Sequence, residues 1–222
     1  MATLSKTLPV PFFTQPTPIT CQSSVLKMFA RYLEAKIGTQ PSKPGAREIG
    51  QIWKEINTGT QRPHQVRNSH ANMKWWLEQH FPMLDFPYET MKNPEAATEK
   101  IVAVINDGFP VLVSVSHARV KGHIILVVGY EHYIPASSSP DFRLVVHDPY
   151  GRFDPSLSSE MFGTKRWDEG ACLASGSELG PGANNRVPVS SISRQRSGDQ
   201  QRGTFYLLFA AEKMCKIPAA TF

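Results

Sequence analysis

The stretch Gln15-Pro-Thr-Pro-Ile-Thr-Cys21-Gln-Ser-Ser-Val-Leu-Lys-Met-Phe29 decides how the rest of the chain is interpreted. Its prolines keep the first half extended, because proline fixes φ and the residue before it avoids the helical region. From Cys21 to about Ile37 one set of apolar residues recurs at helical spacing: Val25, Met28, Phe29, Tyr32 and Leu33. The stretch therefore predicts an extended segment that runs into a helix, with a cysteine in its first turn.

Cys21 lies where a thiol can become a nucleophile. A helix N-terminus presents unpaired backbone N–H groups and the positive end of the helix dipole, and both favour the thiolate form. The neighbouring residues Thr20, Gln22 and Ser23 are polar. Free cysteine is also among the most buried residue types. Cys21 taken alone is therefore as compatible with a structural role as with a catalytic one.

Length and composition predict one domain of 222 residues with a core of its own, since 41% of the residues are apolar. The net charge of +5 would suit an anionic polymer such as nucleic acid or a bacterial envelope. The basic residues are dispersed along the chain, however, so we expect no nucleic-acid partner. We find neither a secretory signal nor a run of ~18 apolar residues that could span a membrane. The expected location is the cytoplasm, unless another process releases the protein.

Cysteine and histidine spacing predicts neither a metal site nor a cofactor. Cys21, Cys172 and Cys215 lie far apart without a CxxC motif, which favours a reducing compartment over a disulfide framework or a zinc site. The downstream pair, Cys172 and Cys215, is expected to be incidental. His64, His70 and His80 do not form an i, i+4 ligand pair. We expect these three histidines to lie on the solvated surface.

The order of the expected elements predicts an α+β fold. A short extended first strand at Leu8–Phe13 is followed by four helices and then by strands. The helices are expected at Cys21–Ile37, about Arg47–Asn57, about Ser69–Phe81 and from Asn93 to Asp107, and the strands at Pro110–Ser116, Gly122–Glu131, Phe142–Asp148 and Gly203–Ala211. Residues 1–222 should form a single domain. The irregular stretch at about 151–203 is predicted to be a long loop or lid.

A histidine and an aspartate fall at matching ends of two expected strands. His123 begins an otherwise apolar strand, and Asp148 ends the next one. If the two strands pair antiparallel, the start of one lies beside the end of the other, so His123 and Asp148 should be neighbours. Side chains alternate along a strand, so only one of His147 and Asp148 can face His123. Each residue alone also fits an ordinary core histidine or a turn, but their order after Cys21 points to nucleophilic catalysis.

These motifs resemble those of a known family. Gln15 followed six residues later by Cys21 at a helix start looks like the oxyanion glutamine and nucleophile of papain-like peptidases. The motifs Gly122-His123-Ile-Ile-Leu-Val-Val-Gly129-Tyr130 and Val146-His147-Asp148-Pro149-Tyr150-Gly151 are similar to those of the bacteriocin-processing (double-glycine leader) peptidases and their stand-alone relatives. The resemblance departs from the family at Pro18-Ile19-Thr20 and in the long polar loop after Gly151.

The resemblance implies a papain-like fold, with a central nucleophile helix in an N-terminal helical half packed on a C-terminal, mainly antiparallel sheet. It implies that Cys21 is the nucleophile, His123 the general base and acid, Asp148 the group that orients His123, and Gln15 the oxyanion donor. The expected activity is hydrolysis of a peptide bond through a thioacyl-enzyme, with a peptide or peptidoglycan-peptide substrate and a cell-wall endopeptidase of phage or bacterial type as one reading. A catalytically inactive binding protein on this scaffold and an acyltransferase with the same three residues remain alternatives.

Overall fold

Helix α1, Cys21–Ile37, begins at the predicted cysteine and ends at Gly38, whose φ of 95° suits glycine. The computed structural model describes residues 3–17, 19–67, 69–115, 122–135, 139–149, 183–194 and 202–213. The other helices are α2 (Ile49–Asn57), α3 (His70–His80), α4 (Pro94–Asn106) and the short 3₁₀ turns η1 (Pro44–Ala46) and η3 (Val189–Ile192). At α4 the predicted cap is present, since Asn93 Oδ1 accepts a hydrogen bond from Ala96 N–H at 2.9 Å.

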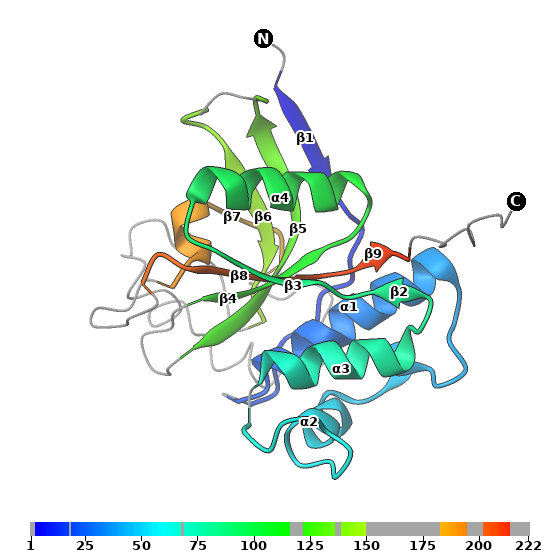
Figure 1. Ribbon diagram of the computed structural model, residues 1–222. Coiled ribbons are helices and arrows are strands. Elements are labelled where there is room, and N and C mark those ends of the chain that lie inside the picture. The colour runs from blue at the N-terminus through cyan, green and yellow to red at the C-terminus, as the bar shows by residue number, and fades with distance from the viewer. Residues whose placement is uncertain are drawn as a thin grey trace, which may run out of the picture.

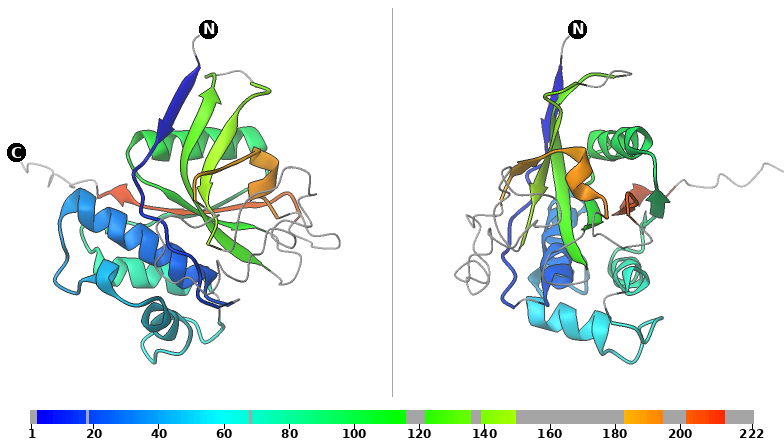
Figure 2. Two further views of the ribbon diagram at one scale, coloured as in Figure 1. Left: turned by 180° about the vertical axis from the view of Figure 1, so that it is seen from behind. Right: turned by 90° about the vertical axis from the view of Figure 1, so that its left-hand side faces the viewer.

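The strands form one large antiparallel sheet and one small one. They are β1 (Leu4–Thr7), β2 (Leu84–Asp85), β3 (Tyr88–Met91), β4 (Val111–Val115), β5 (His123–Tyr133), β6 (Arg143–His147), β7 (Asn185–Val187), β8 (Phe205–Phe209) and β9 (Ala211–Glu212). The large sheet has the order β3-β8-β4-β5-β6-β7, with β1 also paired to β5, and β2 pairs with β9. Helices α1, α2 and α3 gather in one part of the molecule, and α4 lies across one face of the large sheet (Figure 1, Figure 2). This arrangement confirms the predicted α+β, papain-like architecture.

Strand β5 is the longest strand and is covered along one edge by two different partners. β4 pairs with its first half, from His123 to Val127, and β1 takes over from Gly129 to Tyr133. A Cβ atom at Gly129 would lie 2.4 Å from Lys6 O. Glycine is therefore required at this position, because any side chain would push β1 away from the sheet.

The predicted first strand is wrong in position. The structure places the strand at Leu4–Thr7, ahead of the predicted Leu8–Phe13. Leu8 N–H still bonds to Val128 O at 2.8 Å, but Val10 N–H turns back to Leu8 O. Pro9 and Pro11 explain the difference, because proline has no N–H to give to a sheet ladder.

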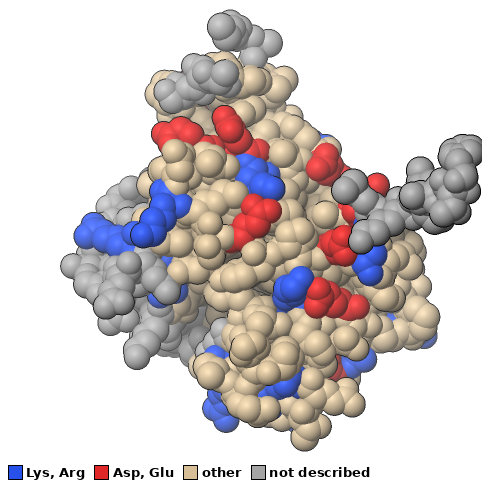
Figure 3. Space-filling model, viewed as in Figure 1, with Lys and Arg blue, Asp and Glu red and all other residues tan. Residues whose placement is uncertain are grey.

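The short strands β2, β3 and β7 were not predicted from the sequence. Strand β7 falls inside the predicted lid of about 151–203 and pairs with β6. Residues 150–182 and 195–201 lie outside the described part of the chain, so the lid itself stays a prediction. No helix in the described ranges is long and apolar enough to cross a membrane. On the face drawn in Figure 3, acidic and basic side chains are interspersed.

His70 is not the solvated surface residue that was predicted, although His64 is exposed. The His70 ring stacks on Tyr88 and Tyr206, with ring centroids 5.0 and 5.9 Å apart. Burial lowers the pKa of His70 to about 4, and the nearby charge of Arg194 acts in the same direction. Packing against two strands far away in the sequence therefore keeps this imidazole neutral.

We predict that the free energy of unfolding falls as the pH is lowered from about 6.5 towards about 4. The pKa of His70 is lower in the folded protein, so the unfolded chain binds the additional proton in this range. The expected loss is about 2 kcal/mol, allowing for partial exposure of the ring. Urea unfolding at several pH values measures it. His70→Phe should keep the stacking and flatten this dependence, whereas His64→Phe should not; an unchanged slope in His70→Phe would contradict the assignment.

Candidate active site

Cys21 stands at the start of α1 without a side-chain cap in front of it. Thr20 occupies the N-cap position, but its hydroxyl donates to Thr17 O at 2.9 Å and accepts from Thr17 N–H at 3.1 Å. The Thr20 side chain is therefore used in its own turn and leaves the first N–H groups of α1 uncapped. Cys21 is a free, half-buried thiol. A developing negative charge at this position would face the positive end of the helix.

His123 and Asp148 lie side by side, as the antiparallel pairing of their strands predicts. β5 and β6 pair antiparallel, with Leu126 opposite His147. His123 Nε2 is 2.7 Å from Asp148 Oδ1, and both side chains are buried. A carboxylate enclosed in this way needs a hydrogen-bonded partner, because an unpaired buried charge is strongly unfavourable. The Asp148 carboxylate thus fixes the orientation of the His123 ring.

The thiol of Cys21 interacts with the same histidine ring. Asp148 and Cys21 both raise the pKa of His123, so the thiol lies within interaction range of the ring. Because Nε2 faces Asp148, Nδ1 is the ring nitrogen available to the thiol. The structure therefore assembles a Cys21–His123–Asp148 chain from the starts of α1 and β5 and the end of β6.

The charge of His123 is set by two opposing influences. Burial alone lowers the pKa of His123, but the charge and hydrogen bond of Asp148, joined by Cys21, outweigh it and raise the pKa to about 9. At neutral pH the ring is therefore an imidazolium. The Cys21 thiol thus lies beside a positively charged ring.

Gln15 lies on the extended segment that leads to Cys21. Its side chain is buried, and Nε2 donates to Thr17 O at 2.8 Å, which leaves a second N–H on the same atom. Its backbone N–H donates to Pro149 O at 3.0 Å and so ties this segment to the turn after Asp148. Gln15 therefore belongs to the same region as the other candidate residues. Its role as oxyanion donor stays a prediction.

His147 points away from the candidate site, as the alternation of side chains along β6 requires. Its Nε2 donates to Val10 O at 2.9 Å, its Nδ1 accepts from Asn184 N–H at 3.1 Å, and its ring packs on Phe12. Burial lowers the pKa of His147, although hydrogen bonds with backbone groups oppose this shift. His147 is thus a neutral structural residue that connects the N-terminal segment to β6, a role that sequence reasoning did not identify.

The other residues considered in the sequence are the two remaining cysteines and the possible metal ligands. Cys172 and Cys215 lie outside the described residues. Within the described ranges, no three His, Cys, Asp or Glu side chains are grouped as metal ligands.

We predict that the His123 ring stays protonated up to about pH 9, because Asp148 holds the charge. NMR titration of the histidine ring resonances measures this directly. Asp148→Asn removes the carboxylate charge and should lower the pKa of His123 by at least about one unit. His147 is the internal control, since its ring should stay neutral at pH 7 in both proteins. A His123 ring that loses its proton below about pH 7 in the unmodified protein would contradict this assignment.

Comparison with known proteins places these residues in a family. The model of the Peptidase_C39 like family matches residues 7–174, a region that contains Gln15, Cys21, His123 and Asp148. A search of curated proteins found no match. Since the matched region covers well over half of the chain, the protein belongs to the Peptidase_C39 like family of cysteine peptidases.

Proposed function

We propose that the protein hydrolyses peptide bonds, with Cys21 as nucleophile, His123 as general acid and base, Asp148 as the residue that orients His123, and Gln15 as oxyanion donor. The observation that carries this proposal is the Cys21–His123–Asp148 chain, in which a buried carboxylate holds an imidazolium next to a free thiol. Membership of a cysteine peptidase family supports the same reaction class.

In the first half of the reaction, the Cys21 thiolate attacks the carbonyl carbon of the scissile peptide bond. A bond forms between Sγ and that carbon, and the carbonyl oxygen becomes an oxyanion. His123 then gives its proton to the leaving nitrogen as the C–N bond breaks, so the amine departs neutral. A thioester on Cys21 remains, and His123 is left as a neutral base.

In the second half, His123 accepts a proton from a water molecule whose oxygen attacks the thioester carbon. The C–S bond breaks, the carboxylic acid leaves, and the thiolate–imidazolium pair is restored. Asp148 keeps the ring in one orientation through both halves, because its hydrogen bond to Nε2 leaves Nδ1 for the moving proton.

The oxyanion is assigned to two donors on the segment around the start of α1. The backbone N–H of Cys21 is one, since it belongs to the uncapped helix N-terminus. The second is the remaining Nε2–H of Gln15, whose side chain is fixed by its bond to Thr17 O. A donor of this kind, fixed in advance, typically contributes a factor of about 10²–10³ to kcat.

For the substrate, we propose peptides of the bacterial cell wall as the first class to test, on the basis of the net charge of +5. The two alternatives differ in what the site does after the thiol reacts. An inactive binding protein would gain nothing from the buried His123–Asp148 pair, because burying two charged groups costs free energy. An acyltransferase would share the thioester and pass the acyl group to an amine in place of water.

The first test is alkylation of the native protein by iodoacetamide at about pH 6, where free thiols are almost fully protonated. Cys21 should be labelled much faster than Cys172 or Cys215, because it stands at a helix N-terminus beside the His123 ring. Mass spectrometry locates the label. His123→Ala should remove this selectivity and Asp148→Asn should weaken it.

Two controls complete this test. The double variant Cys172→Ala/Cys215→Ala should keep the fast labelling and the hydrolysis of peptidoglycan fragments or of a mixture of protein-derived peptides. Cys21→Ala should abolish hydrolysis while the protein stays folded. Equal labelling of all three cysteines in the folded protein would refute the assignment of Cys21.

Gln15→Ala separates oxyanion stabilisation from thiol activation. We expect kcat to fall by about 10²–10³ while the alkylation rate of Cys21 changes by less than about threefold, because alkylation forms no oxyanion. Gln40→Ala is a matched control, since the buried Gln40 side chain also donates to a carbonyl two residues away, Gly38 O at 2.8 Å. A parallel loss of both rates in Gln15→Ala would indicate a structural role.

A further inference from the structure

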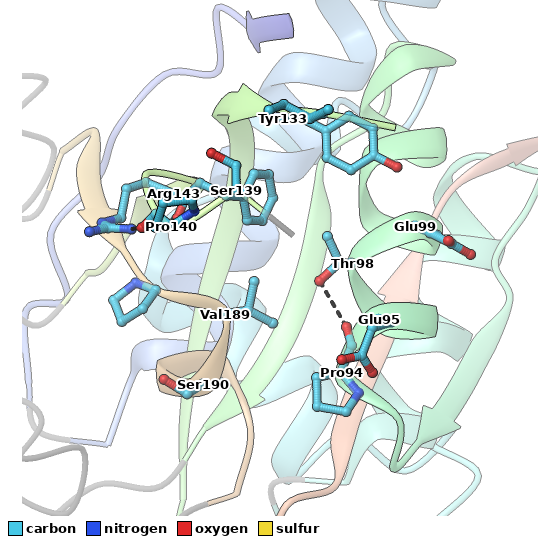
Figure 4. Close-up of a pocket in the computed structure, with 13 residues that line it drawn as sticks. Pro94, Glu95, Thr98, Glu99, Tyr133, Ser139, Pro140, Arg143, Val189 and Ser190 are labelled. Atoms are coloured by element: carbon cyan, nitrogen blue, oxygen red, sulfur yellow. Dashed lines mark hydrogen bonds between the residues drawn. The ribbon is translucent and has the colours of Figure 1, made fainter. Parts of the chain in front are cut away.

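A pocket of about 620 Å³ lies at the far end of the β5–β6 hairpin from Cys21. The N-terminal half of α4 forms one wall, and the end of the hairpin together with η3 forms the other (Figure 4). The volume falls within the range of about 300–1,000 Å³ that is usual for ligand sites. Figure 4 shows Pro94, Glu95, Thr98 and Glu99 of α4 on one side and Pro140, Arg143, Val189 and Ser190 on the other.

This pocket is separate from the candidate active site. His123 begins β5 and Tyr133 ends it, and Tyr133 lines the pocket. At about 3.3 Å per residue, the two ends of this strand are roughly 30 Å apart. None of the residues that line the pocket belongs to the Cys21–His123–Asp148 chain.

The floor of the pocket is apolar and held in place by packing. Tyr133 packs edge-to-face on Phe142 with ring centroids 5.7 Å apart, and Val189 closes the opposite side. Arg143 donates to Pro140 O at 2.9 Å and to Phe142 O at 2.7 Å, which fixes the turn before β6. A ligand would therefore find the pocket largely pre-formed, which lowers the entropic cost of binding.

The wall formed by α4 is acidic. Glu95 and Glu99 both line the pocket and are exposed, and neither carboxylate has an ion pair or hydrogen bond among the described residues. Between them, Thr98 uses its hydroxyl to bond to Pro94 O at 2.8 Å. Arg143 on the opposite wall also lines the pocket, but its guanidinium donates to the Pro140 and Phe142 carbonyls. The two carboxylates therefore leave the described lining with a net negative charge, which favours a cationic group on the ligand.

We propose that this pocket binds a peptide segment that presents a large apolar side chain next to a lysine or an arginine. The apolar side chain would lie on Tyr133 and Phe142, while the basic one would face Glu95 and Glu99. The lining residues come from α4 on one side and from the end of the β5–β6 hairpin with η3 on the other, so one peptide can contact both. The proposal does not depend on the reaction assigned to Cys21.

The test uses Cys21→Ala, so that no probe can be cleaved. Fluorescence anisotropy measures the binding of three labelled peptides with a Gly/Ser background and a central Phe-Lys, Phe-Glu or Ala-Lys pair. We expect the Phe-Lys peptide to bind at least about fivefold more tightly than either of the others. Its affinity should also fall as salt is added, because the carboxylates are exposed.

Substitutions in the pocket identify where the peptide binds. Glu95→Gln/Glu99→Gln should lower the affinity for the Phe-Lys peptide by about fivefold and reduce the salt dependence of its binding. Val189→Trp should fill the pocket and lower the affinity for the Phe-Lys and Phe-Glu peptides by the same factor. The control is Glu212→Gln, an exposed carboxylate on β9, which should change nothing.

Two outcomes would overturn the proposal. One is the failure of the Phe-Lys peptide to bind the folded protein at up to about 1 mM. The other is binding that is unchanged by both the double glutamate variant and Val189→Trp, because the peptide would then occupy a different surface. Neither outcome affects the assignment of Cys21, which is tested by alkylation.

Discussion

The hydrogen bond between His123 and Asp148 is the interaction on which the candidate site depends. Asp148 is fully buried, and a buried carboxylate is tolerated only with a close partner. The antiparallel register of β5 and β6 supplies that partner by placing the start of one strand at the end of the other. The same contact engages Nε2 of His123 and leaves Nδ1 for the Cys21 side, so one hydrogen bond both stabilises the buried carboxylate and orients the ring.

The segment before Cys21 reinforces this geometry from the opposite side. Val10 O accepts a hydrogen bond from His147, and Gln15 N–H donates one to Pro149 O. These bonds fix His147 and Pro149, the residues immediately before and after Asp148. The N-terminal segment therefore positions the end of β6 as well as the start of α1, and it connects the helical part of the protein to the sheet.

Features that depend on local sequence could be predicted, whereas contacts between residues far apart in the sequence mostly could not. Helices α1 and α4 were predicted because apolar spacing and a cap residue are local signals. The contact of His123 with Asp148 followed from strand pairing alone. Strands β2, β3 and β7 are too short to show a period, and the stacking of His70 depends on Tyr88 and Tyr206, which only the fold brings near. The extended Pro-rich segment was mistaken for a strand because proline favours the same φ values without offering a donor.

Strand β1 has a consequence for the behaviour of the whole molecule. It covers the edge of β5 from Gly129 to Tyr133, beyond the point where β4 ends. Proteolytic removal of the residues before Leu8 would leave that edge with unpaired backbone donors and acceptors, a template for strand addition from a second chain. The first strand thus supplies the backbone partners for the end of β5, and an N-terminal truncation intended to simplify the protein would remove them.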